Sequence, residues 1–506
     1  MNKPLWADGR ESYGFPRLER KCITEVCVVG AGIAGLTTAV QLARAGRKVV
    51  LLDKGSIAGG ETGCTTAHIT EVLDMRYADL ISKFGMENTR QVRASSRAAM
   101  DLIAQFVKEL NIQCAHQSLS GYLYTELEED VGELEDELAA MESVGIEAHL
   151  KSEIPLPFPI KTAIEIADQA QFDPLAYCSA LAEEVIRHEG HIFTDTAVKN
   201  VQDRQPCIVQ TGMGEVIADA VAICTHVPVI NRLWIHTKIA PYRSYVVAAP
   251  IEGLGDPPSL FWDTAQPYHF TRMQKKNGTM YLIVGGEDHK TGQIEDTASC
   301  YFRLREYLWS RFGIRQPQFQ WSGQMIEPID GLPFIGKNAF SQQVYIATGF
   351  SGTGITFGTL GGMLIAEEIL GIQNSWQELF RATRKSTVAG SVNFISENVD
   401  YPINVVKQRL ESRPTANEVN VDEGKVVYRN GKKIALYRKP SGEEIALSPV
   451  CTHLGCYVNW NNAEKTWDCP CHGSRFSVEG QVINGPATAA LAPDTSDWEE
   501  PGDKVA

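Results

Sequence analysis

Long hydrophobic runs are absent from this sequence. No stretch of about eighteen apolar residues occurs, so we expect no membrane-spanning helix. The stretch from Met1 to Gly9 has neither a hydrophobic signal core nor a twin-arginine pair, which favours a cytoplasmic location. Basic residues are also fewer than acidic ones, which gives a formal net charge of −15. That charge argues against nucleic acid or an anionic membrane surface as a partner.

The cysteines show no disulfide framework over most of the chain. Eight of the twelve are scattered without regular spacing, which is typical of buried thiols in a reducing compartment. These eight are Cys22, Cys27, Cys64, Cys114, Cys178, Cys207, Cys224 and Cys300. The other four lie in one short C-terminal stretch, which therefore needs a different explanation.

That stretch contains two closely spaced pairs of cysteine and histidine. Cys451 and His453 form the first pair, and Cys469 and His472 form the second, with fifteen residues between the pairs. A [2Fe–2S] centre with two cysteines on one iron and two histidines on the other needs this set of ligands. Zinc is the alternative, because paired loops with Cys and His also bind zinc.

The same stretch resembles the respiratory-type Rieske proteins. Cys456 and Cys471 match the positions that carry a disulfide between the two cluster loops in that family, so the resemblance implies a disulfide here. Ser474 matches the position that donates a hydrogen bond to a cluster sulfur, and Gly485-Pro486 resembles the covering loop. Phe476 replaces the tyrosine of high-potential members, which lowers the expected potential within the Rieske range of roughly −150 to +300 mV.

The N-terminal region has the pattern of a strand, a glycine turn, a helix and a second strand. Val26 to Val29 is a short apolar run, Gly30-Ala31-Gly32-Ile33-Ala34-Gly35 follows at once, and helical periodicity continues from Leu36 to Ala45. The second strand, Lys48 to Leu52, ends in Asp53, which is placed to accept hydrogen bonds from ribose hydroxyls. The glycines let the backbone approach a pyrophosphate at the helix N-terminus, so this context predicts a dinucleotide site.

A second glycine fingerprint is absent, which favours FAD and leaves no obvious NAD(P)H site. The loop from Gly59 to His68 resembles the corresponding loop of the D-amino-acid-oxidase superfamily. The segment from Val344 to Ile355 resembles its closing motif, a strand and glycine turn that aim a long helix at the flavin N1/O2 edge. Gly323-Gln324-Met325 stands where covalent members carry the flavin-linking cysteine, so we expect non-covalent FAD.

These patterns and the resemblance together give a predicted set of FAD contacts. Val198 belongs to the set because that position pairs its backbone with the adenine in the superfamily. His68 is read as a structural histidine, with a catalytic base or a flavin anchor as the alternatives. The full set is Gly30, Ala31, Gly32, Ile33, Ala34, Gly35, Asp53, Lys54, Thr62, Thr65, Thr66, Val198, Thr225, Gly349, Phe350, Ser351, Gly352, Thr353, Gly354 and Ile355.

The middle of the chain is rich in Tyr, Trp and Val. Ile239 to Ala248 and Met280 to Val284 read as strands, which suit an antiparallel substrate sheet over the flavin face. An arginine there would bind a carboxylate bidentately, and aromatic rings would bind a cationic amine. The candidate substrate residues are Tyr242, Arg243, Trp262, Tyr268, His269 and Arg272.

The expected fold class is an α/β FAD-binding (Rossmann-like) domain with an antiparallel-sheet substrate domain, plus a C-terminal all-β Rieske domain. With 506 residues, the chain is too long for a single core. The predicted ranges are 20–75, 165–230 and 325–385 for the FAD-binding domain, 76–164 and 231–324 for the helical/substrate domain, 386–415 for a linker and 416–506 for the Rieske domain.

The resemblance to both families implies a function. FAD would oxidise a small amine or amino acid, and a Rieske [2Fe–2S] cluster would pass the electrons to an external acceptor. A Rieske-type oxygenase is one alternative, but it needs a mononuclear iron held by two His and a carboxylate. Outside the cluster stretch, His188 and His191 are the only close histidine pair, and no partner carboxylate is evident. The other alternative is a redox sensor or electron-transfer protein without its own substrate.

Cofactor analysis of the purified chain tests these expectations. Iron and acid-labile sulfide are expected in equal amounts, because the Cys and His set fits a [2Fe–2S] cluster. Acid precipitation is expected to release all of the flavin as free FAD, because the flavin-linking cysteine is absent. Zinc in place of iron, or flavin that stays with the precipitate, would contradict the respective expectation.

Overall fold

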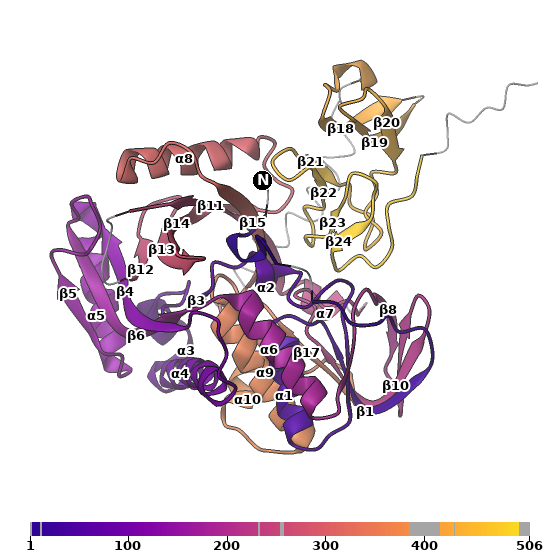
Figure 1. Ribbon diagram of the computed structural model, residues 1–506, viewed down its shortest axis with the longest axis horizontal. Coiled ribbons are helices and arrows are strands. Elements are labelled where there is room, and N and C mark those ends of the chain that lie inside the picture. Colours follow the sequence, from indigo (N-terminus) through magenta and orange to yellow (C-terminus); the bar gives the residue numbers. More distant parts are fainter. Residues whose placement is uncertain are drawn as a thin grey trace, which may run out of the picture. The chain divides into compact units, whose positions relative to one another are not determined.

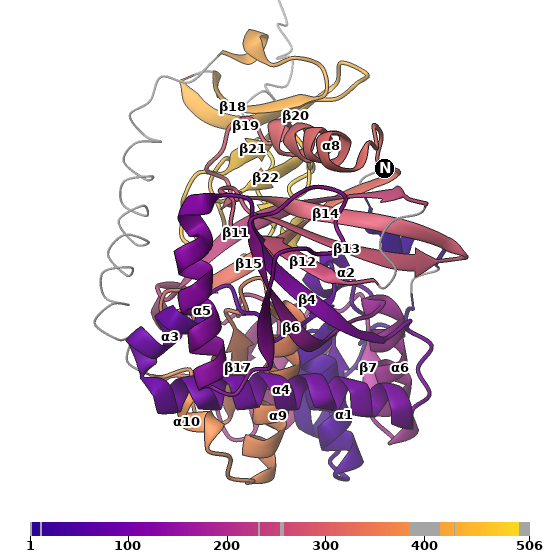
Figure 2. The same cartoon turned by 90° about the vertical axis from the view of Figure 1, so that its left-hand side faces the viewer.

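The computed structural model describes residues 3–10, 13–230, 233–252, 258–384, 415–429 and 431–494. Figures 1 and 2 show it from two directions. The chain divides into two units: unit 1 comprises Met1–His289 and Ser299–Ile395, and unit 2 comprises Lys290–Ala298 and Ser396–Ala506. Of the predicted linker over 386–415, only Thr415 is among the described residues. Within the described ranges, no helix is both long enough and apolar enough to cross a membrane.

Unit 1 contains the predicted Rossmann-like sheet. Its strand order is β16-β17-β10-β1-β2-β7, and all of these neighbours are parallel except β16 and β17. The strands are β1 (Cys22–Val29), β2 (Val49–Leu52), β7 (His191–Phe193), β10 (Glu215–Ile223), β16 (Phe334–Lys337) and β17 (Val344–Thr348). The antiparallel strands β8 (Val198–Gln202) and β9 (Cys207–Thr211) extend it through β10. Both β2 and β17 are buried throughout, as their apolar sequences predict.

Helices α1 (Ile33–Arg44) and α9 (Gly354–Leu370) pack together against this sheet (Figure 1). Glycines in α9 make the approach possible, because a Cβ at Gly362 would lie 2.5 Å from Thr37 Cβ and one at Gly358 would lie 2.5 Å from Ile33 Cγ2. Helix α4 (Met86–Glu109) packs across α9 (Figure 2). Gly85, with φ 80°, separates α3 (Tyr77–Phe84) from α4.

The substrate sheet of unit 1 has the order β15-β11-β14-β13-β12-β4-β6-β3. Its strands are β3 (His68–Ile69), β4 (Gln117–Thr125), β6 (Thr162–Gln171), β11 (Ile239–Pro250), β12 (Leu260–Asp263), β13 (His269–Lys276), β14 (Thr279–Lys290) and β15 (Phe319–Pro328), with β5 (Ala148–Lys151) paired to β6. The β12–β4 pair is parallel, whereas the β11–β15, β12–β13 and β13–β14 pairs are antiparallel as predicted. The predicted boundaries at residues 165 and 325 fall inside β6 and β15, so these strands cross them.

Helix α8 (Ala298–Phe312) covers one face of the substrate sheet, on the side away from α1 and α9 (Figure 1). Its Tyr301 ring meets Tyr245 of β11 at 5.0 Å, and its Tyr307 ring meets His269 of β13 at 4.1 Å. Helix α5 (Val131–Ser143) lies beyond β4 in the chain and packs on β5 and β6. The opposite face of β11 and β13 is therefore the one available to a flavin.

Unit 2 is all-β in its C-terminal part, as predicted. One sheet contains β18 (Glu423–Arg429), β19 (Lys432–Arg438) and β20 (Glu444–Leu447), and a second contains β21 (Asn459–Asn461), β22 (Thr466–Asp468), β23 (Arg475–Phe476) and β24 (Val482–Asn484). The segment Lys290–Ala298 also belongs to this unit. Its Gly292 carbonyl accepts a 2.7 Å hydrogen bond from Asn459 Nδ2, and Thr297 Oγ1 accepts one of 3.0 Å from Ala463 N.

The start of α6 (Pro174–Arg187) gives a test of local stability. Asp173 caps this helix by accepting hydrogen bonds from Leu175 N and Ala176 N at 3.0 and 3.1 Å, and Arg10 forms an ion pair with it at 2.8 Å. Asp173→Ala is expected to lower the free energy of unfolding by about 1–2 kcal/mol, because the first-turn N–H groups lose their acceptor. Urea denaturation followed by circular dichroism measures this change. Asp173→Asn keeps a capping oxygen and should lose clearly less; equal losses would contradict the capping role.

Candidate functional site

The predicted glycine turn connects β1 to α1. Gly30 has φ 105°, and a Cβ there would lie 2.4 Å from the carbonyl oxygen of Cys224. A Cβ at Gly32, the N-cap of α1, would lie 2.8 Å from Thr62 Oγ1. Side chains are therefore excluded at these two positions, and the backbone there stays open to a ligand at the helix N-terminus, where N–H groups lack intrahelical partners.

Asp53 lies beside the same turn at the end of β2. Its carboxylate accepts hydrogen bonds from Ala31 N at 2.6 Å and from Gly55 N at 2.8 Å. Burial raises the pKa of Asp53, and the two backbone hydrogen bonds oppose that rise. Thr62 Oγ1 accepts from Ile33 N at 3.1 Å, so the 59–68 loop approaches the first turn of α1. These residues form the cradle that the fingerprint predicts for a dinucleotide.

The closing loop reaches the same edge of the sheet. Strands β1, β10 and β17 are parallel, so their carboxyl ends lie on one side, and each leads into predicted cofactor residues. Thr348 Oγ1 at the end of β17 donates a 2.6 Å hydrogen bond to the carbonyl of His226, which follows β10. Residues 349–353 then lead to the N-terminus of α9. Two helix N-termini, of α1 and α9, therefore lie at one sheet edge.

The other predicted FAD residues are distributed around this edge. Thr65 Oγ1 accepts from Ala67 N at 3.0 Å, and Thr66 Oγ1 lies 3.1 Å from His68 Nδ1. Thr225 Oγ1 donates to the carbonyl of Val227 at 2.8 Å. Val198 is buried at the start of β8. Burial lowers the pKa of His68 well below its usual value, and its ring packs between Trp262 and Phe270.

The candidate substrate residues lie on two faces of the sheet. Successive residues of a strand point to opposite faces. Arg243 shares the face of Tyr245, and His269 stacks on Tyr307, so both lie on the face that α8 covers. His269 is also held there by Asp263, at 3.0 Å between Nδ1 and Oδ2. The flavin-side face carries the other candidates, namely Tyr242, Trp262, Tyr268 and Arg272.

Arg272 contacts protein atoms with most of its guanidinium. Its Nη1 donates to the carbonyl of Ala67 at 2.7 Å, and its Nη2 donates to the carbonyl of Phe172 at 3.3 Å and to Gln274 Oε1. The side chain is fully buried and lies 5.1 Å from the ring centre of Trp6. The guanidinium thus joins the 59–68 loop to β13, a role different from the carboxylate binding that the sequence suggested.

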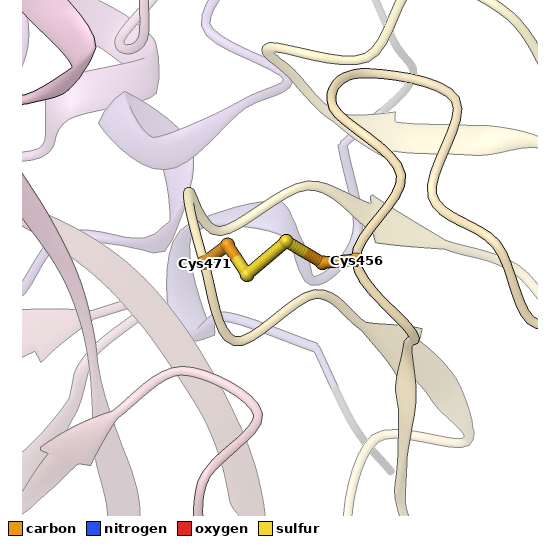
Figure 3. Close-up of a disulfide and its surroundings, with 2 residues drawn as sticks. All are labelled: Cys456 and Cys471. Carbon is orange, nitrogen blue, oxygen red and sulfur yellow. A yellow bond between two sulfur atoms is a disulfide. The ribbon is translucent and has the colours of Figure 1, made fainter. Parts of the chain in front are cut away.

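Two loops of unit 2 bring the predicted cluster residues together. The disulfide between Cys456 and Cys471, implied by the Rieske resemblance, is present with a Cα–Cα distance of 6.6 Å (Figure 3). The rings of His453 and His472 are 4.9 Å apart and nearly perpendicular. Cys469 Sγ lies within 4.8 Å of both disulfide sulfurs. One cysteine and one histidine of each pair thus meet their counterparts across the two loops, Cys451 with Cys469 and His453 with His472.

Hydrogen bonds to sulfur surround the two predicted thiolate ligands. Cys451 accepts from the thiol of Cys469, from the Ser474 hydroxyl and from the backbone N–H groups of His453 and Leu454; the Cys469 bond is the largest cause that lowers the Cys451 pKa. Cys469 accepts from two backbone N–H groups in its own loop. Ser474 is fully buried, and its Oγ accepts from Ala487 N at 3.0 Å, just after Gly485-Pro486. Donors aimed at ligand sulfurs stabilise negative charge there, so this site fits a cluster.

The histidine pair considered for an oxygenase does not converge on a metal site. His188 ends α6 and lies 3.2 Å from Glu184 Oε1, while His191 is exposed at the start of β7. Among the described residues, the His, Cys, Asp and Glu atoms that converge as a group of three belong to Cys456, Cys469 and Cys471. No observation of the described chain favours the oxygenase alternative.

Two acidic residues on the flavin side, Asp74 and Asp288, are not among the candidates selected from the sequence. Asp74 accepts a hydrogen bond from Gly352 N of the closing loop, and Asp288 interacts with Tyr268 and Ser244. The Gly285-Gly286 pair that precedes Asp288 was the available signal, because adjacent glycines in a strand often mark a change of direction.

The family models match both parts of the chain. The model of the FAD dependent oxidoreductase family matches residues 25–368, and that of the Rieske [2Fe-2S] domain matches residues 413–494. The chain therefore belongs to the family of FAD-dependent oxidoreductases and carries a C-terminal Rieske domain. Its cofactors are FAD and a [2Fe–2S] cluster.

Individual relatives agree with this architecture. The chain is 32% identical over 490 residues to the putative Rieske 2Fe-2S iron-sulfur protein YhfW of Bacillus subtilis (strain 168), covering 96% of each. It is 43% identical over 77 residues to the chloroplastic cytochrome b6-f complex iron-sulfur subunit of Arabidopsis thaliana, covering 15% of this chain and 30% of that protein. Its fold resembles glycine oxidase from Geobacillus kaustophilus, with a TM-score of 0.61, 18% identity, and coverage of 72% of this chain and 99% of that one.

Gly30 gives a test of the cradle. Gly30→Ala is expected to weaken FAD binding at least about tenfold, because the new Cβ meets backbone at 2.4 Å and the turn must move. Titration of deflavinated protein with FAD, followed by flavin fluorescence, measures the change. Gly46→Ala is the control, since Gly46 also has a positive φ of 81° but open space around it. Equal effects of the two substitutions would show that general strain is responsible.

Proposed function

We propose that this protein oxidises a small amine or amino acid at the carbon beside the nitrogen. In that reaction a C–H and an N–H bond break, a C=N bond forms, and two electrons and two protons leave the substrate. Bound FAD supplies a hydride acceptor, and the cluster supplies a one-electron carrier to an external acceptor. The observation that carries the proposal is the presence of both cofactor sites in one chain. A substrate sheet beside the flavin cradle supports it.

Within this proposal the N-terminal residues hold the dinucleotide. The turn from Gly30 to Gly35 and the N-terminus of α1 would bind the pyrophosphate through backbone N–H groups. Asp53 would exchange its bonds to the turn for a bond with the ribose. The closing loop from Gly349 to Thr353 and the N-terminus of α9 would stabilise negative charge at the flavin pyrimidine edge.

The residues of unit 2 have matching roles in the proposal. Cys451 and Cys469 would ligate one iron, and His453 and His472 the other. Ser474 and the backbone N–H groups around the thiolates would stabilise the reduced cluster and so raise its potential. Phe476, which is fully buried, offers no hydroxyl for the same purpose. We also propose a cytoplasmic location, supported by the eight scattered cysteines, all of which are free thiols.

Anaerobic mixing of candidate amines and amino acids with the holoprotein tests the proposed electron path. The flavin absorbance is expected to bleach first, and the EPR signal of the reduced cluster is expected to follow. Cys469→Ser should retain bleaching and lose the EPR signal, because a cluster ligand is removed. Cys22→Ser, which alters a free thiol far along the chain from the cluster loops, should retain both signals. Bleaching that is never followed by the cluster signal in the unmodified protein would refute the internal path.

A further inference from the structure

A kink in β14 turns one acidic side chain toward the flavin side. Gly286 has φ 144° and Glu287 has φ 60°, and a Cβ at Gly286 would lie 2.3 Å from the Tyr268 carbonyl oxygen. His269 pairs with Gly286, so regular alternation would place Asp288 on the face that α8 covers. The kink reverses the alternation, so that residues 287 and 289 point to the face that α8 covers. Glu287 instead reaches Arg303 of α8 at 2.5 Å, and His289 reaches Tyr245 at 3.1 Å, which leaves Asp288 on the opposite face.

The Asp288 carboxylate is only partly satisfied by the protein. It accepts hydrogen bonds from the hydroxyls of Ser244 and Tyr268. Its Oδ1 is inaccessible to solvent and receives no hydrogen bond from any described residue. Burial, with the nearby Asp74 carboxylate, raises the pKa of Asp288 to about 7. The residue as a whole is only half-buried, so it is accessible from the flavin side. A ligand there that brings N–H donors and positive charge would stabilise the ionised carboxylate.

Asp74 links the Asp288 carboxylate to the closing loop of the flavin site. Its carboxylate accepts a hydrogen bond from Gly352 N, and it interacts electrostatically with both Asp288 and Tyr268. Desolvation raises the pKa of Asp74, and the hydrogen bond from Gly352 N opposes that rise. Asp74, Tyr268 and Asp288 therefore lie together at the end of the site where the flavin pyrimidine edge is expected.

Apart from Arg76, the charges that act most strongly on Asp74, Tyr268 and Asp288 are negative. Carboxylates of Asp288, Asp74 and Glu327 raise the pKa of Tyr268 after burial, which has the largest effect. Arg76 attracts Asp74, but the guanidinium of Arg272 on the same face of the sheet binds the carbonyls of Ala67 and Phe172. A substrate carboxylate would meet repulsion here rather than a bidentate arginine.

We propose that the substrate side of this site recognises an organic ammonium ion without a neighbouring carboxylate, and that Asp288 receives its N–H donors. Asp74 and Tyr268 are the positioning residues beside it. The inference rests on the proposed function and narrows its substrate class from amines and amino acids to amines. The selectivity comes from charge, because a charge-assisted hydrogen bond to Asp288 is available to the amine, whereas the carboxylates of Asp74 and Asp288 repel a substrate carboxylate.

Calorimetric titration of the dithionite-reduced holoprotein under anaerobic conditions tests this inference by binding rather than by turnover, because a reduced flavin cannot accept a hydride. The probes are n-butylamine, its α-carboxylated counterpart norvaline in both enantiomers, 1,4-diaminobutane and butyrate. The two amines are expected to bind at least about tenfold more tightly than norvaline, and butyrate is expected not to bind. Asp288→Asn should weaken the binding of both amines at least about tenfold. Asp168→Asn, which removes an exposed charge from the same sheet, should leave it unchanged.

Several results would overturn the inference. They are tighter binding of norvaline or butyrate than of n-butylamine, amine affinity that Asp288→Asn leaves within about twofold, or no binding of either amine to the unmodified protein. The comparison of n-butylamine with norvaline needs no variant, so it holds even if Asp288→Asn fails to fold. Flavin reduction by norvaline together with tight norvaline binding would reject this inference and leave the proposed function intact. Absence of flavin reduction by any amine or amino acid would reject the proposed function itself.

Discussion

The close approach of two helices to one edge of a parallel sheet is the constraint on which unit 1 depends. Helices α1 and α9 pack against each other through Gly358 and Gly362, where a side chain would collide with Ile33 or Thr37. Their N-termini then lie at the carboxyl ends of β1 and β17, which β10 holds in parallel register. Backbone N–H groups and helix dipoles gathered at one place make a site for a phosphate-containing, partly anionic cofactor. The substrate sheet presents its uncovered face to the same edge.

Unit 2 solves a different problem, because it must hold four ligands in place with a small core. The Cys456–Cys471 disulfide links the two ligand loops, and the Ser474 hydroxyl links the second loop to Ala487 of the third. Buried residues such as Trp467 and Phe476 pack behind the loops. The loops are therefore fixed at several points, as a site that holds four ligands in place requires.

Much of this organisation was predictable, because local patterns specify it. The Gly30–Gly35 turn and the Cys and His pairs each depend on residues within a few positions of one another, so the local sequence was enough to predict a dinucleotide turn and a cluster stretch. The Rieske disulfide followed from resemblance rather than from spacing. The family matches confirm the fold class and both cofactors.

What the sequence could not predict depends on long-range register. Arg243 and His269 lie on the covered face of the sheet because of how β11 and β13 pair, which no local pattern reveals. The guanidinium of Arg272 donates hydrogen bonds to the carbonyls of Ala67 and Phe172, which lie 205 and 100 residues away in the chain. The face of the sheet on which Asp288 lies depends on the positive φ angles of Gly286 and Glu287. The membership of Lys290–Ala298 in unit 2 likewise has no sequence signal.

The central claim is that flavin and cluster act in series within one polypeptide. A spectroelectrochemical titration of the holoprotein, which follows the flavin by absorbance and the cluster by EPR, tests it most directly. The account predicts a cluster midpoint potential at or above that of the flavin, within the Rieske range of roughly −150 to +300 mV. A cluster potential far below that of the flavin would keep electrons on the flavin and contradict the account.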